Sequence, residues 1–85
     1  MLTGIVYAMN PRRGMVAIKT EEYDFTIIEL LGDDDIELGD EMRWKNDTGL
    51  GGETYLNVSK GRRMEVYVQN HWVPEKQLRQ QLLVG

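Results

Sequence analysis

The stretch GIVYAMN at residues 4–10, followed by PR at 11–12 and RGMVAI at 13–18, determines how the chain begins to fold. Both outer segments are rich in β-branched and other apolar residues, which favour strands. Pro11 lacks a backbone donor and Gly14 tolerates a positive φ, so the chain reverses between the two segments. The stretch therefore predicts an antiparallel hairpin with a tight turn.

Short apolar runs separated by glycine-containing breaks continue along the chain. We expect strands at residues 2–9, 15–19, 23–31, 41–45, 54–58 and 64–69. Pro74 suits the first position of a helix, and Leu78, Leu82 and Leu83 give that helix an apolar stripe. Because so short a helix does not persist alone in water, we expect it to cover one end of the barrel or the same element of a second subunit. A small single domain, either a β-barrel or a β-sandwich, is the expected architecture.

The order and spacing of these segments resemble the cold-shock domain, which has the OB fold. That family opens with G-x-V-K-W-F-N and then K-G-F-G-F-I, and residues 4–18 align with both motifs without a gap. Later family segments align with residues 24–28, 36–44 and 55–58. The resemblance covers residues 1–59 and implies an all-β, OB-like five-stranded antiparallel barrel. Residues 60–85 would then be a C-terminal extension, one extra strand and a short helix, packed on the same domain.

The resemblance also implies single-stranded nucleic-acid binding, but the positions that carry it are altered. In the family, aromatic side chains on the first three strands stack on bases, and such stacking contributes about 1–3 kcal/mol per base. The corresponding positions here hold Ala8, Met15, Ala17, Thr26 and Ile28. The resemblance therefore supports the fold more strongly than it supports tight binding.

Charge is unevenly distributed along the chain. The net charge is −4, and residues 21–41 carry ten acids and no base. Phosphate affinity comes from lysine and arginine, so an acidic domain is not built for strong nonspecific binding. Basic and aromatic side chains remain as candidate nucleic-acid contacts, namely Tyr7, Arg12, Arg13, Tyr55, Arg62 and Arg63. The alternative interpretation is that the tyrosines fill the core and the arginines are solvated turn residues.

Catalytic and metal-binding patterns are missing from the sequence. The chain has no cysteine and a single histidine, His71, and its only serine, Ser59, lies in no nucleophile motif. The acidic run at residues 33–35 lacks the spacing of a calcium loop. We therefore expect no enzyme activity, no metal and no cofactor. The chain start does not resemble a signal peptide and no run approaches the roughly 20 apolar residues of a membrane span, so we expect a cytoplasmic protein with no membrane partner.

The sequence and the family resemblance support two hypotheses about function. The first is weak, charge-driven binding of single-stranded RNA or DNA. The alternative is a protein–protein interaction module on a cold-shock scaffold that has lost nucleic-acid binding, with an unidentified protein or a second copy of the chain as partner. Exposed aromatic rings among basic residues would favour the first, and an exposed aliphatic face of Met15, Ile27 and Ile28 would favour the second.

Overall fold

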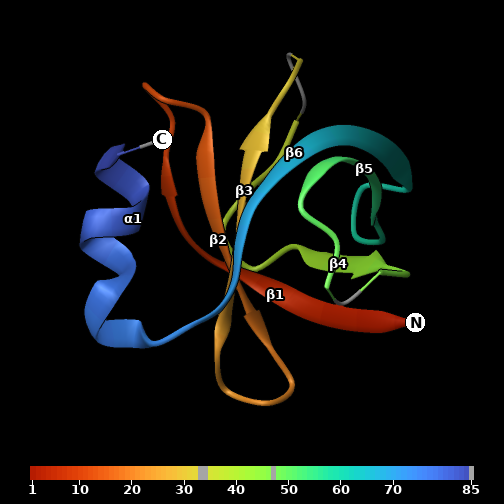
Figure 1. The fold of residues 1–85 in the computed structure, drawn as a ribbon. Helices are drawn as coiled ribbons and strands as arrows, with labels where there is room; N and C mark the ends of the chain where they lie inside the picture. Colours follow the sequence, from red (N-terminus) through yellow and green to blue (C-terminus); the bar gives the residue numbers. More distant parts are fainter. Residues whose placement is uncertain (33–34, 47, 85) are drawn as a thin grey trace.

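A computed structural model describes residues 1–32, 35–46 and 48–84. Within them the chain forms six strands, a short 3₁₀ turn and one α-helix (Figure 1). The elements are β1 (Leu2–Asn10), β2 (Met15–Thr20), β3 (Phe25–Leu30), β4 (Glu41–Trp44), β5 (Gly51–Asn57), β6 (Arg62–Val73), η1 (Glu75–Gln77) and α1 (Leu78–Val84). All six strands were expected at these places, although β5 begins earlier and β6 is longer than the sequence pattern indicated.

The six strands close into one barrel in the order β1-β2-β3-β6-β5-β4, with β4 paired back on β1. Every neighbouring pair is antiparallel. A barrel whose strands alternate in direction needs an even number of them, because an odd number leaves two parallel strands at the seam. This corrects the expectation of a five-stranded barrel with an extra strand, since β6 pairs with β3 and completes the closure. The fold is a closed, small antiparallel β-barrel, compatible with an OB-like fold.

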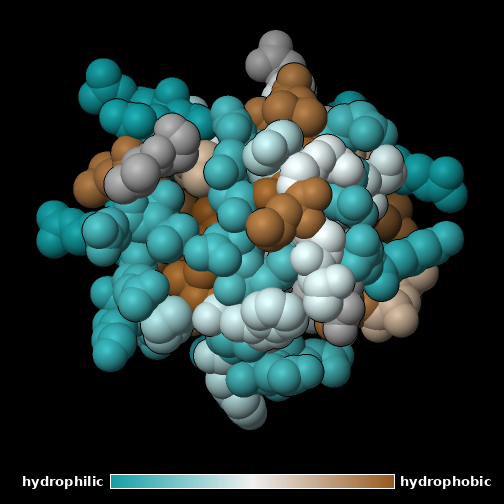
Figure 2. Space-filling model, viewed as in Figure 1, coloured by the Kyte–Doolittle hydropathy of each residue, from teal (hydrophilic) through white to brown (hydrophobic). Residues whose placement is uncertain are grey.

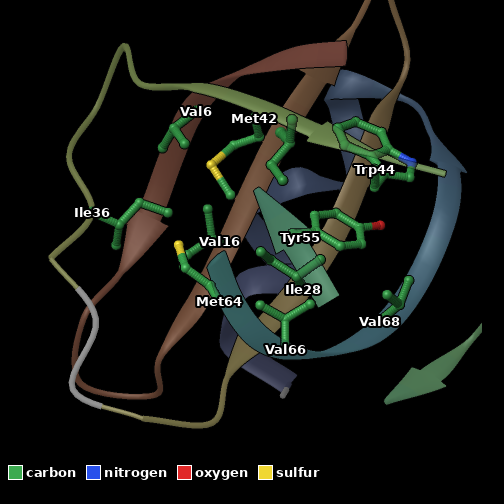
Figure 3. Packing of buried hydrophobic residues seen from close by; sticks show 11 residues of the cluster. Val6, Val16, Ile28, Ile36, Met42, Trp44, Tyr55, Met64, Val66 and Val68 are labelled. Atoms are coloured by element: carbon green, nitrogen blue, oxygen red, sulfur yellow. The ribbon is translucent and has the colours of Figure 1, made fainter. Parts of the chain in front are cut away.

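Because neighbouring strands run in opposite directions, the segments that connect successive strands lie alternately at the two ends of the barrel. The chain start, the turn at residues 21–24 and the segment joining β4 to β5 lie at one end, which we call the Trp44 end. The turn at 11–14, the segment joining β3 to β4 and the turn at 58–61 lie at the other, which we call the Ile36 end. Figure 3 shows Trp44 and Ile36 on opposite sides of the core. The described acids of residues 21–41 therefore do not form one face, because β3 separates Glu21, Glu22 and Asp24 from Asp35, Glu37 and Asp40.

The barrel interior is filled by one side-chain layer from each strand (Figure 3). Its buried members are Val6, Val16, Ile18, Ile28, Ile36, Met42, Trp44, Tyr55, Met64, Val66 and Val68. Alternation along β4, and along β6 from Arg63 to Val68, follows the period of two that a half-buried strand requires. A one-residue irregularity in the β1–β2 pairing, between Val6 and Ala8, turns Ala8 to the outside of the barrel.

A second apolar cluster lies outside the barrel, beneath α1. It consists of Met15, Ala17, Phe25, Ile27, Val73 and Leu78, with Ala8 and Leu82 partly buried at its margin. Strands β2 and β3 are consequently buried on both faces over four consecutive residues each. Asn10 Nδ2 donates a hydrogen bond to the Leu82 carbonyl oxygen at 3.1 Å, which fixes the end of the helix against β1. The helix is docked, as expected, but it lies on the wall formed by β1, β2 and β3. This corrects the expectation that it covers one end of the barrel.

Candidate nucleic-acid interface

Tyr55 lies inside the barrel and is only 1% exposed. Its ring stacks on Trp44, with centroids 4.8 Å apart and planes 3° apart. Burial raises the pKa of the Tyr55 hydroxyl far above its usual range. This corrects the expectation that Tyr55 contacts nucleic acid, because β5 turns the residue into the core and leaves its ring no free face.

Tyr7 lies on the outer surface of β1, where it supports the helix segment. Its ring is 5.0 Å from the ring of Phe25, and its hydroxyl donates a hydrogen bond to Glu75 Oε2 at 2.8 Å. That hydrogen bond and the negative charge of Glu75 raise the pKa of Tyr7. Lys19 Nζ lies 5.6 Å from the ring centroid. Tyr7 is 44% exposed, but its contacts join the chain to its own C-terminal segment.

The two predicted arginine pairs lie at the same end of the barrel without forming one surface. Arg12 and Arg13 are exposed on the turn between β1 and β2, and Arg62 and Arg63 are exposed at the start of β6. The described residues 35–40, which precede β4, lie at the same end, where the Gly39 amide donates a hydrogen bond to the Val6 carbonyl oxygen at 2.8 Å. That segment carries Asp35, Glu37 and Asp40, and Lys60 of the second turn pairs with two of them, at 2.7 Å from Glu37 and 3.5 Å from Asp40.

The positions that correspond to the stacking rings of the cold-shock family are not available to a ligand. Ala8, Met15 and Ala17 lie under α1 in the second apolar cluster. Thr26 and Ile28 face the barrel interior, so the outward positions of β3 are those of Phe25 and Ile27. The helix therefore occupies the wall that carries the first three of these positions, and their small or flexible side chains make room for it.

The wall formed by β4, β5 and β6 is on the opposite side of the barrel from α1 (Figure 1). Arg43 pairs with Leu56, and Leu56 pairs with Arg63, so these three outward side chains form one row across three strands. They line an open groove of about 600 Å³, whose other lining residues include Met1, Lys45, Gly52, Glu53, Thr54 and Glu65. We call this surface the arginine groove.

The charges of the arginine groove are mixed, with basic side chains in slight excess. Arg43 Nε contacts Glu41 Oε2 at 3.1 Å, and Glu65 accepts a hydrogen bond from Thr54 Oγ1 at 2.9 Å. Among the described residues, Arg63 and Lys45 form no ion pair. Tyr67 projects from the same wall opposite Gly52 and is 46% exposed.

Sequence reasoning found Arg63 but missed its neighbours Arg43 and Lys45. A signal for them existed, because Met42 and Trp44 alternate with Arg43 and Lys45 in a strand-like run. What the sequence could not supply is the pairing that places Arg43 and Arg63 in one row, since they lie on strands separated by β5.

The candidate metal ligands and the single histidine and serine are not brought together in the described part of the chain. No group of histidine, aspartate and glutamate residues there has the arrangement of a metal site. Asp33 and Asp34, from the predicted acidic run, lie outside the described residues. Ser59 accepts a hydrogen bond from the Glu41 amide at the Ile36 end. The His71 ring is hydrogen-bonded to Thr26 Oγ1 and to the Gly49 carbonyl oxygen, and not to Ser59.

No family model, no curated protein and no solved structure matches this chain. The described helices include none long and apolar enough to cross a lipid bilayer. The family resemblance therefore rests on the quoted motifs alone, while the closed antiparallel barrel rests on the strand pairing.

Proposed function

We propose that the chain binds single-stranded nucleic acid weakly, through phosphate contacts in the arginine groove. The observation that carries this proposal is the row formed by Arg43, Leu56 and Arg63 on the wall that the helix leaves open. Guanidinium groups bind phosphate oxygens bidentately, and Leu56 between them offers an apolar contact for a sugar or a base. Lys45 extends the basic surface toward the Trp44 end.

Weak binding follows from the composition of the same groove. Glu53 and Glu65 repel phosphate from within it, and Arg43 is already shared with Glu41. Tyr67 is the exposed aromatic residue opposite a residue of the groove, whereas Trp72 lies beyond the groove at the end of β6, so stacking at the groove adds about the contribution of one base, roughly 1–3 kcal/mol. Binding should therefore depend strongly on salt and little on base sequence.

The protein-interaction alternative would have been favoured by an exposed aliphatic face of Met15, Ile27 and Ile28, and these residues are buried. Met15 is 1% exposed, and Ile27 and Ile28 are fully buried, because α1 and the barrel interior cover them. On the face seen in Figure 2, hydrophobic residues form separate small patches among hydrophilic ones. Large continuous apolar patches are what mark protein-binding surfaces.

The proposal is tested by titrating labelled single-stranded DNA and RNA oligomers and following fluorescence anisotropy from low salt to about 0.15 M. Replacing Arg43 and Arg63 together by alanine should weaken binding alike for all oligomers. The slope of log affinity against log salt should flatten by about 1.4, since each lost contact on a single strand contributes about 0.7. The double variant of Arg12 and Arg13 removes the same charge from the other side of the Ile36 end and is the matched control. Equal losses in both double variants, or no binding at low salt, would reject the arginine groove as the site.

A further inference from the structure

Tyr67 lies on the outer face of β6, beside the arginine groove. It pairs with Gly52 of β5, which lines the groove, and the side chains of directly paired residues lie on the same face of a sheet. Arg63 precedes Tyr67 on the same face of β6, about 13 Å away at the usual rise of a strand. A short single strand held by the arginines of the groove therefore reaches the Tyr67 ring.

The glycines opposite Tyr67 leave room beside its ring. A Cβ atom at Gly52 would meet nothing within 4 Å, although the residue directly opposite is a tyrosine. A Cβ atom at Gly51 would lie 3.9 Å from Tyr67 Cε2, so the edge of the ring rests near the Gly51 backbone. The outer face therefore has an open space above Gly52, bordered by a half-exposed aromatic ring. Nucleobases stack on rings that are accessible in this way.

The groove side of this space is lined by a hydrogen-bond acceptor. Glu65 lines the groove two residues before Tyr67, and its Oε1 atom accepts a hydrogen bond from Thr54 Oγ1 at 2.9 Å. No described lysine or arginine forms an ion pair with Glu65. An ionised carboxylate only accepts hydrogen bonds and has about four lone-pair positions. Glu65 can therefore accept further hydrogen bonds from a ligand.

A second carboxylate lies on the other side of the ring, away from the groove. Glu29 of β3 pairs with Tyr67 and accepts a hydrogen bond from Gln69 Nε2 at 3.0 Å. It is not among the residues that line the groove. Glu29 therefore resembles Glu65 in charge and in its internal hydrogen bond, but the ring separates it from Gly52.

Guanine is the base whose edge best matches a carboxylate. Its N1–H and its N2 amino group are adjacent donors, so one carboxylate can accept from both in a bidentate arrangement. Thymine and uracil place their single N–H donor between two carbonyl oxygens, which a carboxylate repels. Glu65 also repels phosphate, so a strand lies with its phosphates toward the arginines and a base toward Tyr67.

We propose that Tyr67 and the space above Gly52 form a base-binding subsite of the arginine groove, and that this subsite prefers guanine. The ring of Tyr67 stacks on the base, and Glu65 accepts its N1–H and N2 amino hydrogen bonds. This inference rests on the proposed function, because the arginines hold the strand. The preference concerns one base of each bound strand, so it changes affinity by a few fold and leaves the salt dependence to the arginines.

The probes are thymidine oligomers of equal length and equal label that carry one central guanine, inosine or thymine. Inosine keeps the purine rings and the N1–H of guanine but lacks the N2 amino group. Fluorescence anisotropy at low salt measures their affinities for the full chain. The guanine oligomer should bind about twofold to tenfold more tightly than the inosine oligomer, the contribution of one hydrogen bond. The thymine oligomer should bind no more tightly than the inosine oligomer.

Variants separate this subsite from the arginines. Tyr67→Leu removes the ring and should weaken binding of the guanine oligomer by about fivefold or more, with an unchanged salt slope. Gly52→Val keeps the ring and every charge but fills the space, so the preference for guanine over inosine should vanish. Glu65→Gln should abolish this preference as well. Glu29→Gln removes the same charge on the far side of the ring, should keep the preference, and is the matched control.

The inference is overturned if wild-type protein binds the guanine and inosine oligomers equally. It is also overturned if Gly52→Val keeps the preference, or if Glu29→Gln removes it as fully as Glu65→Gln does. If Tyr67→Leu does not fold, the comparison of the three oligomers and the other variants decide. Binding that needs Arg43 and Arg63 but shows no base preference rejects this subsite alone, whereas no binding of any oligomer at low salt rejects the subsite together with the arginine groove.

Discussion

Gly4 lies where β1 passes close to β2. A Cβ atom at this position would lie 2.6 Å from Ile18 Cγ2 and 2.7 Å from the Lys19 carbonyl oxygen. Because the carbonyl belongs to the backbone, it cannot move without disturbing the β1–β2 pairing. We expect Gly4→Ala to lower the free energy of unfolding by about 1–3 kcal/mol, the usual cost of overpacking.

Gly52 provides the control, because a Cβ atom there would meet nothing within 4 Å. Gly52→Ala should change the free energy of unfolding by less than about 0.5 kcal/mol. Urea denaturation of both variants measures the difference. Equal destabilisation would show that the close approach at Gly4 does not constrain the barrel.

Asp40 is a buried carboxylate, 6% exposed, at the Ile36 end. Burial opposes its charge, but hydrogen bonds from Asn57 Nδ2 at 2.9 Å and the Glu37 amide at 3.0 Å favour it. Together with the charge of Lys60, they hold the pKa of Asp40 below its ordinary value of 3.8. A carboxyl with a lowered pKa stabilises the fold above its unfolded-state pKa, and this contribution is lost as the pH falls through the folded-state value.

Wild-type protein should therefore lose more stability than Asp40→Asn between about pH 5 and pH 2. The measurement is the free energy of unfolding in urea at a series of pH values. Glu22→Gln, which removes an exposed carboxylate, should follow the wild-type curve. Parallel curves for wild type and Asp40→Asn would contradict the role assigned to the buried carboxylate.

Single residues show where sequence reasoning reached its limit. A shift of one residue in the alignment of a strand exchanges its inward and outward side chains. The alignment with the cold-shock family put Thr26 and Ile28 on the outer face of β3, whereas the structure places both in the barrel interior. In β5 the neighbours Tyr55 and Leu56 are both large and largely apolar, and alternation alone does not tell which points inward. The pairing of β5 between β4 and β6 settles the choice.

Elements were predicted better than side-chain directions, because short apolar runs between glycine breaks are a strong signal. The length of β6 was underestimated since its last residues, from Asn70 to Val73, break the alternation where the pairing with β3 is irregular. Docking of the helix was predictable from Leu78 and Leu82. Its location was not, because nothing local tells which wall of a barrel a helix will cover.

Helix α1 provides a sharp test of that docking. Leu78 is 6% exposed in the cluster beneath the helix, whereas Leu83 is 53% exposed. We expect Leu78→Ala to lower the free energy of unfolding by about 2–4 kcal/mol, as for other buried leucines. Leu83→Ala should cost less than about 0.5 kcal/mol. Thermal and urea unfolding compare the two variants, and equal small effects would mean that the helix is not packed in solution.

The whole molecule depends on a strand that the sequence pattern set apart as an extension. Met64, Val66 and Val68 of β6 belong to the interior cluster, and β6 fills the space between β3 and β5. A fragment ending at residue 59 would leave two open strand edges and an incomplete core. We expect this fragment to give a collapsed, undispersed ¹⁵N–¹H spectrum, while the full chain gives a dispersed one. A dispersed spectrum from the fragment would restore the boundary after residue 59.

The closed barrel limits the ways in which this protein can bind another chain. Each of the six described strands has a partner on both sides, and the shortest pairing, between β4 and β5, extends over two residues, so no described strand offers a full-length row of free amide and carbonyl groups to a neighbouring chain. Recruitment of a partner by strand addition, and the edge-to-edge aggregation that comes with it, both need such groups. Recognition must then pass through side chains and turns. Specificity can therefore change by substitution on one wall or at one end of the barrel, while the backbone that holds these side chains stays the same.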